Sequence, residues 1–352
     1  MPEELVKGRG AQYNVHNRFD KIERVKEHPE GIDEEEVLKR ETQFTRVFPK
    51  TILNKVESED LFDAYSLNPY QGCEHGCIYC YARTTHEFLG YSAGLDFESK
   101  IMVKMNAATL LEKEISASRY VVKPIMLSGN TDCYQPIEKK LGLTRRILET
   151  LLKHRHPVSM ITKNVLVLRD LDILIEMAKL NLLHVNVSIT SLNEELRQKM
   201  EPRTATNKRR VELVKELSDN QIPVNVMIAP IIPSLNDHEI PEIMQAVAEA
   251  GALSAGYVFV RLNGTVGKLF TDWIHKAYPD RAEKVLNQIK EAHGGSLEDK
   301  RAGLRMRGEG KIADSIRDLF TISKKKYFAE KAMPPFDMTI FKGKISQQLS
   351  LF

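Results

Sequence analysis

Residues 68–83 read NPYQGCEHGCIYCYAR and contain three of the four cysteines in the 352-residue chain. The three follow the spacing C-x3-C-x2-C and are Cys73, Cys77 and Cys80. Three thiols cannot pair evenly into disulfides, and such close spacing would strain any pair. Gly72 and Gly76 allow the backbone to curl so that the sulfurs converge. The segment therefore predicts a metal or iron–sulfur site.

The local ligand set favours an iron–sulfur cluster over zinc. Structural zinc usually takes four protein ligands, and the one local candidate for the fourth is His75, which would be cramped between the first two cysteines. A [4Fe–4S] cluster normally takes one cysteine for each iron. Three cysteines would leave one iron open to a chelating cofactor. A structural zinc or a redox-inert loop is the alternative interpretation.

The pattern C-x3-C-x-aromatic-C, with Tyr79 as the aromatic residue, resembles the signature of the radical S-adenosylmethionine (SAM) superfamily. The resemblance implies that the open iron binds the amino and carboxylate groups of SAM. It implies that the reduced cluster cleaves SAM to a 5′-deoxyadenosyl radical, which abstracts hydrogen from a substrate. An external one-electron reductant of flavodoxin or ferredoxin type is expected with it.

Composition is ordinary for a soluble globular protein, with 42% apolar and 28% charged residues. We find neither an apolar run long enough to span a bilayer nor a signal peptide, so we expect a cytoplasmic protein without membrane contact. The net charge is +3, but residues 265–352 carry 17 Lys and Arg against 11 Asp and Glu. A solvated helical surface is the simplest explanation of this basic excess.

Short apolar runs alternate with amphipathic segments from residue 65 onward. This alternation predicts an α/β fold with a parallel sheet, and six units suggest an open, partial (βα)6 barrel, TIM-like, as in the radical SAM core. We expect residues 1–60 to form an arm that packs on the barrel without a chemical role. Residues 61–264 would form the core, 265–332 a helical extension and 333–352 a tail. The expected strands are 65–68, 124–128, 158–162, 185–190, 224–229 and 256–262, and the expected helices are 107–118, 139–154, 170–179, 208–219 and 239–250.

The arm itself shows weaker signals. Asp33 can cap an acidic helix, with Glu36 in the capping-box position. Residues 45–48 and 51–53 read as short strands on either side of Pro49.

Ligands of parallel α/β barrels bind at the carboxyl ends of the strands, and these ends carry the candidate SAM contacts. The segment after the second strand resembles the one that holds the SAM ammonium group in the family, although the usual Gly-Gly-Glu is absent. Lys163, at the third strand end, suits a carboxylate, and Arg203 suits a carboxylate or phosphate; a surface lysine is the alternative for Lys163. Polar residues on one face of the fourth strand would contact SAM or buried water. The candidates are Ser128, Gly129, Asn130, Asp132, Ser188, Thr190 and, for an adenine-edge turn, Ile231.

Further motifs resemble the spore photoproduct lyase-like branch, also called DNA repair photolyase-like. They are Asn68-Pro69-Tyr70, Tyr81-Ala82-Arg83 and residues 131–136, TDCYQP, while residues 8–11 and 90–96 resemble an uncharacterised subgroup. The resemblance covers about residues 8–265. It implies nucleic-acid repair or modification, and a role for Cys133 as hydrogen donor; a buried structural thiol is the alternative.

Three functions stay open at this point. A radical SAM enzyme acting on DNA or RNA is the first. The second is a non-catalytic iron–sulfur or zinc protein associated with nucleic acid, and the third is a radical SAM enzyme acting on protein or a small metabolite. The C-terminal Gln348-Leu349-Ser350-Leu351-Phe352 resembles the peptide by which bacterial repair proteins bind the sliding clamp, or else it fills an apolar groove of its own barrel.

Overall fold

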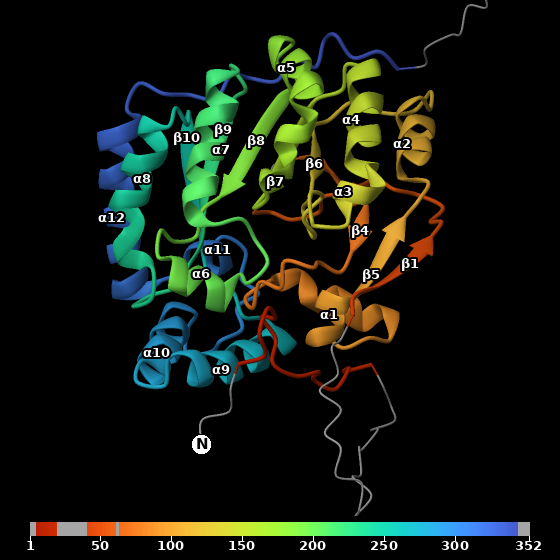
Figure 1. Ribbon diagram of the computed structural model, residues 1–352. Helices are drawn as coiled ribbons and strands as arrows, with labels where there is room; N and C mark the ends of the chain where they lie inside the picture. The colour runs from red at the N-terminus through yellow and green to blue at the C-terminus, as the bar shows by residue number, and fades with distance from the viewer. Residues whose placement is uncertain (1–4, 20–40, 61–62, 344–352) are drawn as a thin grey trace, which may run out of the picture.

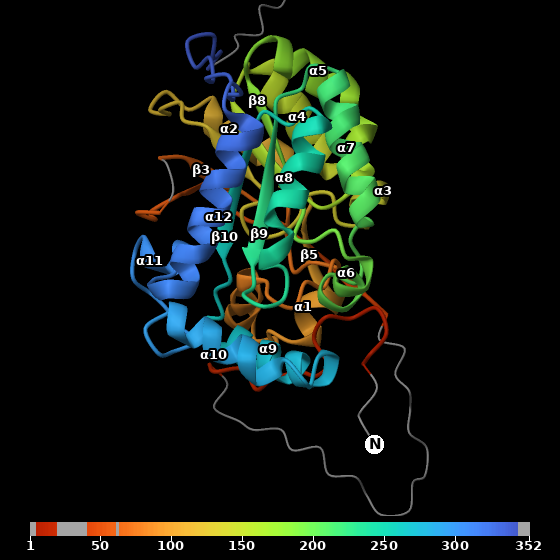
Figure 2. The same cartoon turned by 90° about the vertical axis from the view of Figure 1, so that its left-hand side faces the viewer.

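The computed structural model describes residues 5–19, 41–60 and 63–343 (Figure 1). The helix expected from Asp33 and the segment from Gln348 to the C-terminus lie outside the described residues. Within them, the chain forms a large curved sheet with helices on its outer side and a smaller sheet beside it (Figures 1 and 2).

The large sheet confirms the predicted α/β fold and open partial barrel. Its seven strands follow the order β10-β9-β8-β7-β6-β3-β2, and all neighbours are parallel except β2 and β3. Six parallel strands thus follow one another in chain order, as six βα units require. The strands are β2 (Asn54–Lys55), β3 (Tyr65–Leu67), β6 (Ile125–Leu127), β7 (Val158–Thr162), β8 (Leu183–Ser188), β9 (Val224–Ile231) and β10 (Ser254–Phe259).

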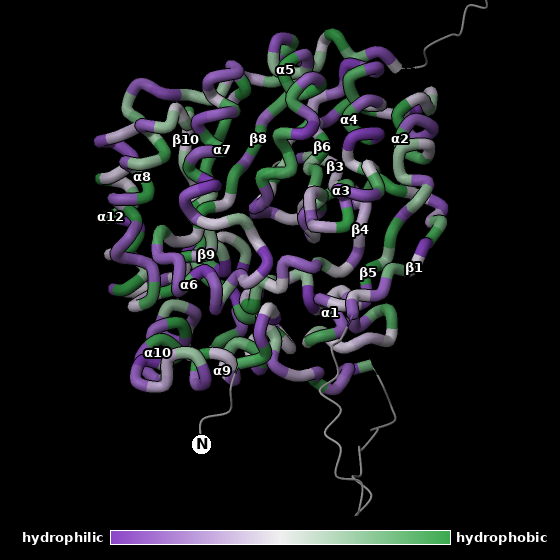
Figure 3. Tube along the Cα trace, viewed as in Figure 1, coloured by the Kyte–Doolittle hydropathy of each residue, from purple (hydrophilic) through white to green (hydrophobic). Residues whose placement is uncertain are grey.

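Strand alternation decides which side chains face the barrel interior. In β8, Leu183, Val185 and Val187 are fully buried beneath the outer helices, whereas Asn186 and Ser188 point to the opposite face. Figure 3 shows hydrophobic stretches along the strands and outer helices, with hydrophilic stretches in many of the connecting loops. The outer layer consists of α2 (Ala107–Ile115), α4 (Leu143–Lys153), α5 (Leu171–Lys179), α7 (Asn207–Asp219) and α8 (Ile240–Glu249), with short α3 (Glu138–Leu141), η2 (Val165–Asp170), α6 (Glu194–Met200) and η3 (Asp237–Glu239) at the connections.

The small sheet was only partly predicted. It has the order β1-β5-β4 and comprises β1 (Gln43–Val47), β4 (Tyr70–Gln71) and β5 (Lys100–Lys104). The expectation of a strand at residues 51–53 is wrong. The backbone N–H groups of Ile52 and Leu53 donate to the Glu114 carboxylate at 2.6 and 3.1 Å, so a side chain takes the place of a strand partner.

The C-terminal region is helical, as expected. It contains α9 (Thr265–Ala277), α10 (Ala282–Ala292), α11 (Leu304–Arg307) and the long α12 (Gly310–Phe328), which packs on α8 (Figure 2). Beyond it, the chain crosses the N-terminal ends of the strands, where the Pro334 carbonyl lies 2.8 Å from His184 Nε2. Among the described residues, none of the helices is both long and apolar enough to cross a membrane.

Candidate active site

A cavity of about 690 Å³ lies at the carboxyl ends of the large sheet's strands. All three clustered cysteines line it, and so do most of the predicted SAM contacts. The predicted residues that it brings together are Cys73, Cys77, Cys80, Tyr79, Ser128, Gly129, Asn130, Asp132, Lys163 and Ser188. Residues assigned above to the arm also line it, namely Lys55, Ser58 and Asp60, so the arm is not remote from the chemistry.

The cysteine loop is held by a buried arginine that follows it. Arg83 lies in η1 (Tyr81–Leu89) and is fully buried. Its guanidinium donates to the carbonyls of Cys77 and Gly76, at 2.9 and 3.1 Å, and forms a 2.5 Å ion pair with Glu98 of α1 (Leu95–Ser99). Because a planar guanidinium has five fixed donors, one side chain sets several backbone groups at once.

The N-terminal segment packs against the outer side of the same loop. Backbone N–H groups of Gly10 and Ala11 donate to the Glu98 carboxylate at 3.2 and 2.8 Å. A Cβ added to Gly10 would lie only 1.7 Å from the Gly76 carbonyl oxygen, so no larger residue fits without displacing the backbone. The resemblance at residues 8–11 therefore corresponds to a contact with the cysteine loop.

The loop after β6 is positioned by Asn68. The Asn68 Oδ1 atom accepts from the backbone N–H groups of Asn130 and Thr131, at 2.8 and 3.3 Å. The Tyr81 hydroxyl donates to the Gly129 carbonyl. The predicted SAM-binding segment is thus fixed by residues on either side of the cysteines.

Asp132 is engaged by protein donors. Its carboxylate accepts from Thr162 Oγ1 at 2.8 Å and from the Lys163 backbone N–H at 2.8 Å, and it lies 3.4 Å from His75 Nδ1. Burial opposes its ionisation, but His75 and these hydrogen bonds outweigh burial and lower the pKa of Asp132. Asp132 therefore joins the cysteine loop to β7.

Tyr79 is held by a buried carboxylate that the sequence analysis missed. The Tyr79 hydroxyl donates to Glu201, which also accepts from Thr190 Oγ1 at 2.6 Å and pairs with Arg210 at 2.5 Å. Burial alone would raise the pKa of Glu201, but Arg210 and Lys163 hold it at about 2. Glu201 and Arg210 are fully buried, and their exclusion from water makes the pairing tight.

Four predicted residues do not line the cavity. Thr190 lies beyond the end of β8 and turns to Glu201, while Ile231 is buried where β9 pairs with β10. The Arg203 backbone N–H donates to the His75 carbonyl at 3.3 Å, and Gly8 lies beside its side chain. Cys133 is fully buried in the core; its backbone N–H donates to Ser128 Oγ, and its carbonyl accepts from Thr144 Oγ1. Roles in SAM binding or hydrogen donation stay predictions for these four.

The donor set fits a cluster better than a single metal ion. All three clustered thiols line one cavity, and a [4Fe–4S] cluster takes one thiolate for each iron, so three thiolates would leave its fourth iron open. Burial raises the pKa of the Cys77 thiol to about 12 and that of Cys73 well above its usual value. Iron coordination would supply the positive charge that these thiolates need.

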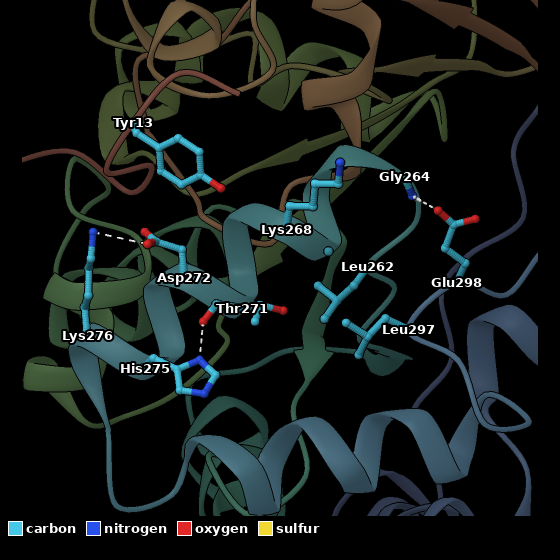
Figure 4. A pocket seen from close by; sticks show the side chains of 11 residues that line it. Tyr13, Leu262, Gly264, Lys268, Thr271, Asp272, His275, Lys276, Leu297 and Glu298 are labelled. Carbon is cyan, nitrogen blue, oxygen red and sulfur yellow. Dashed lines mark hydrogen bonds and ion pairs between the residues drawn. The ribbon is translucent and has the colours of Figure 1, made fainter. Parts of the chain in front are cut away.

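A second cavity, of about 700 Å³, lies between α9 and the N-terminal segment (Figure 4). Several of its polar groups pair with one another: Asp272 lies 3.1 Å from Lys276, and the Gly264 N–H donates to Glu298 at 2.9 Å. No cysteine lines it. The cavity that holds the three thiols is therefore the candidate active site.

Comparison with known proteins shows the family of the chain. The sequence profile of the Radical SAM superfamily matches residues 67–247. An uncharacterised protein of Mycobacterium tuberculosis is 32% identical over 240 residues, which cover 67% of this chain and 71% of that protein. One of Methanocaldococcus jannaschii is 32% identical over 224 residues, covering 64% and 80%.

Among solved structures, spore photoproduct lyase complexed with dinucleoside spore photoproduct matches with a TM-score of 0.57 at 16% identity. The match covers 81% of this chain and 79% of the lyase, and it shows that the two share a fold. The superfamily uses a [4Fe–4S] cluster and SAM. The profile match spans the cysteine loop and, in full, four of the six parallel strands, β6 to β9, and the chain belongs to the radical SAM superfamily.

Proposed function

We propose that this radical SAM enzyme abstracts hydrogen from a nucleic-acid substrate, in repair or modification of DNA or RNA. The observation that carries the proposal is one cavity lined by three cysteine thiols, with basic side chains at its mouth. We call the group formed by Lys55, Asp60 and Arg261, which line the cavity, and by Arg305, which pairs with Asp60, the cavity mouth. Cations beside an exposed aromatic ring, here Tyr81, suit single-stranded nucleic acid.

The residues of this chain have distinct proposed roles. Cys73, Cys77 and Cys80 would hold the cluster, and the segment 128–130 with Lys163 and Ser188 would hold SAM. When bound, the reduced cluster supplies the electron that cleaves SAM to a 5′-deoxyadenosyl radical. Arg83 and Glu201 act indirectly, because they fix the cysteine backbone and the Tyr79 ring.

The nucleic-acid assignment draws on the fold relative as well. That lyase was solved in complex with a dinucleoside spore photoproduct, which supports the proposal of a nucleic-acid substrate for this chain. Protein and small metabolites are the competing substrate classes, and each predicts a different source of the abstracted hydrogen.

Isotope transfer separates these classes. We would reconstitute the enzyme anaerobically with iron and sulfide, add dithionite and SAM, and supply uniformly deuterated DNA, RNA, protein or metabolites separately. Mass spectrometry of the 5′-deoxyadenosine then reports the hydrogen source. We expect deuterium from DNA or RNA. Deuterium from protein or metabolites alone would contradict the proposal.

Partner proposals follow from the same assignment. We propose a reductant of flavodoxin or ferredoxin type, a cytoplasmic location, and sliding-clamp binding through Gln348-Leu349-Ser350-Leu351-Phe352. Pull-down of the clamp by the intact chain, abolished on removal of residues 348–352 while SAM cleavage survives, would support the last of these. A truncation that lowers thermal stability, with no clamp bound by the intact chain, would contradict it.

A further inference from the structure

The two edges of the open sheet are joined by one carboxylate. Asp60 follows β2, at one edge, and Arg305 lies in α11, which packs beside β10 at the other edge (Figure 2). The Asp60 carboxylate accepts from the Arg305 guanidinium and from the Gly303 backbone N–H. Arg305 also donates to Ser58 Oγ at 3.0 Å. The Asp60 side chain is only 4% exposed, so this contact is sheltered at the cavity mouth.

A second arginine at the mouth lacks such a partner. Arg261 follows β10, is half-buried and lines the cavity. Within the described part of the chain, its guanidinium has no hydrogen bond or ion pair; it lies 5.1 Å from the centre of the Tyr81 ring. Burial lowers the pKa of Arg261, as does the nearby charge of Arg305, while Tyr81 and Asp60 raise it. The Asp60 carboxylate thus interacts electrostatically with both Arg261 and Arg305.

The charge balance at the mouth favours an anion. Lys55, Asp60 and Arg261 line the cavity, and Arg305 pairs with Asp60, so these four side chains carry three positive charges and one negative charge. The other charged pair in the lining, Lys163 and Asp132, adds no net charge. A half-buried guanidinium without a partner gains from a ligand that supplies hydrogen-bond acceptors. Phosphate oxygens match the forked donors of arginine, and one phosphate can accept from two guanidinium groups.

We propose that Arg261 and Arg305 bind a phosphate group of the substrate, and that Asp60 competes with this phosphate for Arg305. The inference deepens the proposed function, on which it rests, because it names a phosphorylated substrate and the residues that recognise it. Tyr81 is 49% exposed and its ring lies against Arg261, so the ring would lie beside the group that carries the phosphate. A carboxylate in this position excludes weakly binding anions and yields to one that contacts both arginines.

The test uses the reconstituted holoenzyme and a fluorescent single-stranded oligothymidylate of about eight nucleotides, a length typical of single-strand binding sites. Fluorescence anisotropy gives the Kd over a series of salt concentrations. A methylphosphonate oligomer of the same length lacks the charges, and inorganic pyrophosphate tests the anion site without a nucleic acid. The variants are Arg261→Gln, Arg305→Gln and Asp60→Asn. Arg209→Gln is the matched control, since Arg209 is an exposed arginine that pairs with Glu212 on α7.

We expect each of the two arginine variants to weaken phosphodiester binding about tenfold or more. The slope of log K against log salt should fall in magnitude by about 0.7 for each phosphate that the variant no longer neutralises. Asp60→Asn should strengthen binding, because asparagine can still accept from Gly303 but carries no competing charge. The methylphosphonate should respond to none of these changes, and Arg209→Gln should match the parent.

The opposite sign expected for Asp60→Asn separates recognition from simple damage to the mouth, which would weaken binding in all three variants. Weaker binding in Asp60→Asn, or equal weakening in Arg209→Gln, would overturn the inference. Weaker SAM binding in the arginine variants would also overturn it, since the arginines would then serve the cofactor. Arginine-dependent binding of pyrophosphate but of no oligonucleotide would support the anion site and contradict the nucleic-acid proposal.

Discussion

The cysteine loop and the cavity mouth lie on the same cavity but are built in contrasting ways. Arg83, fully buried, joins the loop backbone to Glu98, and Glu98 also holds the N-terminal segment. At the mouth, Arg305 is 25% exposed and meets the opposite edge through Asp60 and Ser58. A cofactor site benefits from ligands fixed by surrounding groups, whereas elements that admit a substrate come from the less stable parts of a fold. The contrast supports the proposal that the chemistry takes place at the loop and that the substrate is recognised at the mouth.

The largest effect should come from breaking the buried pair behind the cysteines. In Arg83→Met, Glu98 would remain as a buried charge without its partner, and we expect a loss of about 3–5 kcal/mol in the free energy of unfolding. Anaerobic denaturant unfolding and iron content per chain measure it. The control Arg209→Met removes an exposed pair and should cost about 1 kcal/mol or less. Equal losses of stability in Arg83→Met and Arg209→Met would contradict the view that the buried pair stabilises the cysteine loop more than an exposed pair stabilises the surface.

A smaller loss is expected where the N-terminal segment meets the loop. Gly10→Ala places a methyl group against the Gly76 carbonyl, and overpacking of this kind costs about 1–3 kcal/mol. Gly343→Ala is the matched control, because its Cβ would meet only the Phe341 ring, at 3.7 Å. Unfolding midpoints and iron content should fall for Gly10→Ala alone. Unchanged iron in that variant would show that the segment does not support the cysteines.

Acid should lower the free energy of unfolding through Asp299, which lies in the loop between α10 and α11. Hydrogen bonds from Arg301 are the main cause that holds the pKa of Asp299 at about 2. The unfolded chain would bind this proton near pH 4. The carboxylate therefore contributes stability that is fully present above about pH 4 and is lost as the pH falls towards 2. Stability of Asp299→Asn should depend less on pH across that window. Parallel pH curves for parent and variant would contradict this role.

The smallest effect is expected from the fourth cysteine. Cys133 is buried away from the cavity, so Cys133→Ala should keep the iron content and SAM cleavage of the parent and cost less than about 2 kcal/mol. Iron analysis and 5′-deoxyadenosine yield test this. A drop in iron content would indicate that Cys133 is a fourth ligand, and the cluster site would then extend beyond the cysteine loop.

Patterns local in sequence account for what could be predicted. Cys73, Cys77 and Cys80 lie within eight residues, and the six parallel strands coincide with short segments rich in apolar residues. Thr190 was expected beside Ser188 by alternation, but β8 ends at Ser188 and the alternation ends with it.

Contacts between distant residues could not be predicted. Glu201 meets Tyr79 across 122 positions, and Asp60 meets Arg305 across 245. Neither pair leaves a periodic signal in the sequence, because each depends on how separate loops converge at the strand ends. The role of Arg83 was missed as well, although its tripeptide was recognised, because its hydrogen bonds to the Gly76 and Cys77 carbonyls depend on how the loop folds.

Reductive cleavage of SAM tests the central claim most directly. The anaerobically reconstituted enzyme, given dithionite and SAM, should form 5′-deoxyadenosine and methionine. Cys73→Ala, Cys77→Ala and Cys80→Ala should each abolish both products together with the visible absorbance of the cluster. Stoichiometric zinc in the parent, with no SAM cleavage after reconstitution with iron and sulfide, would contradict the account.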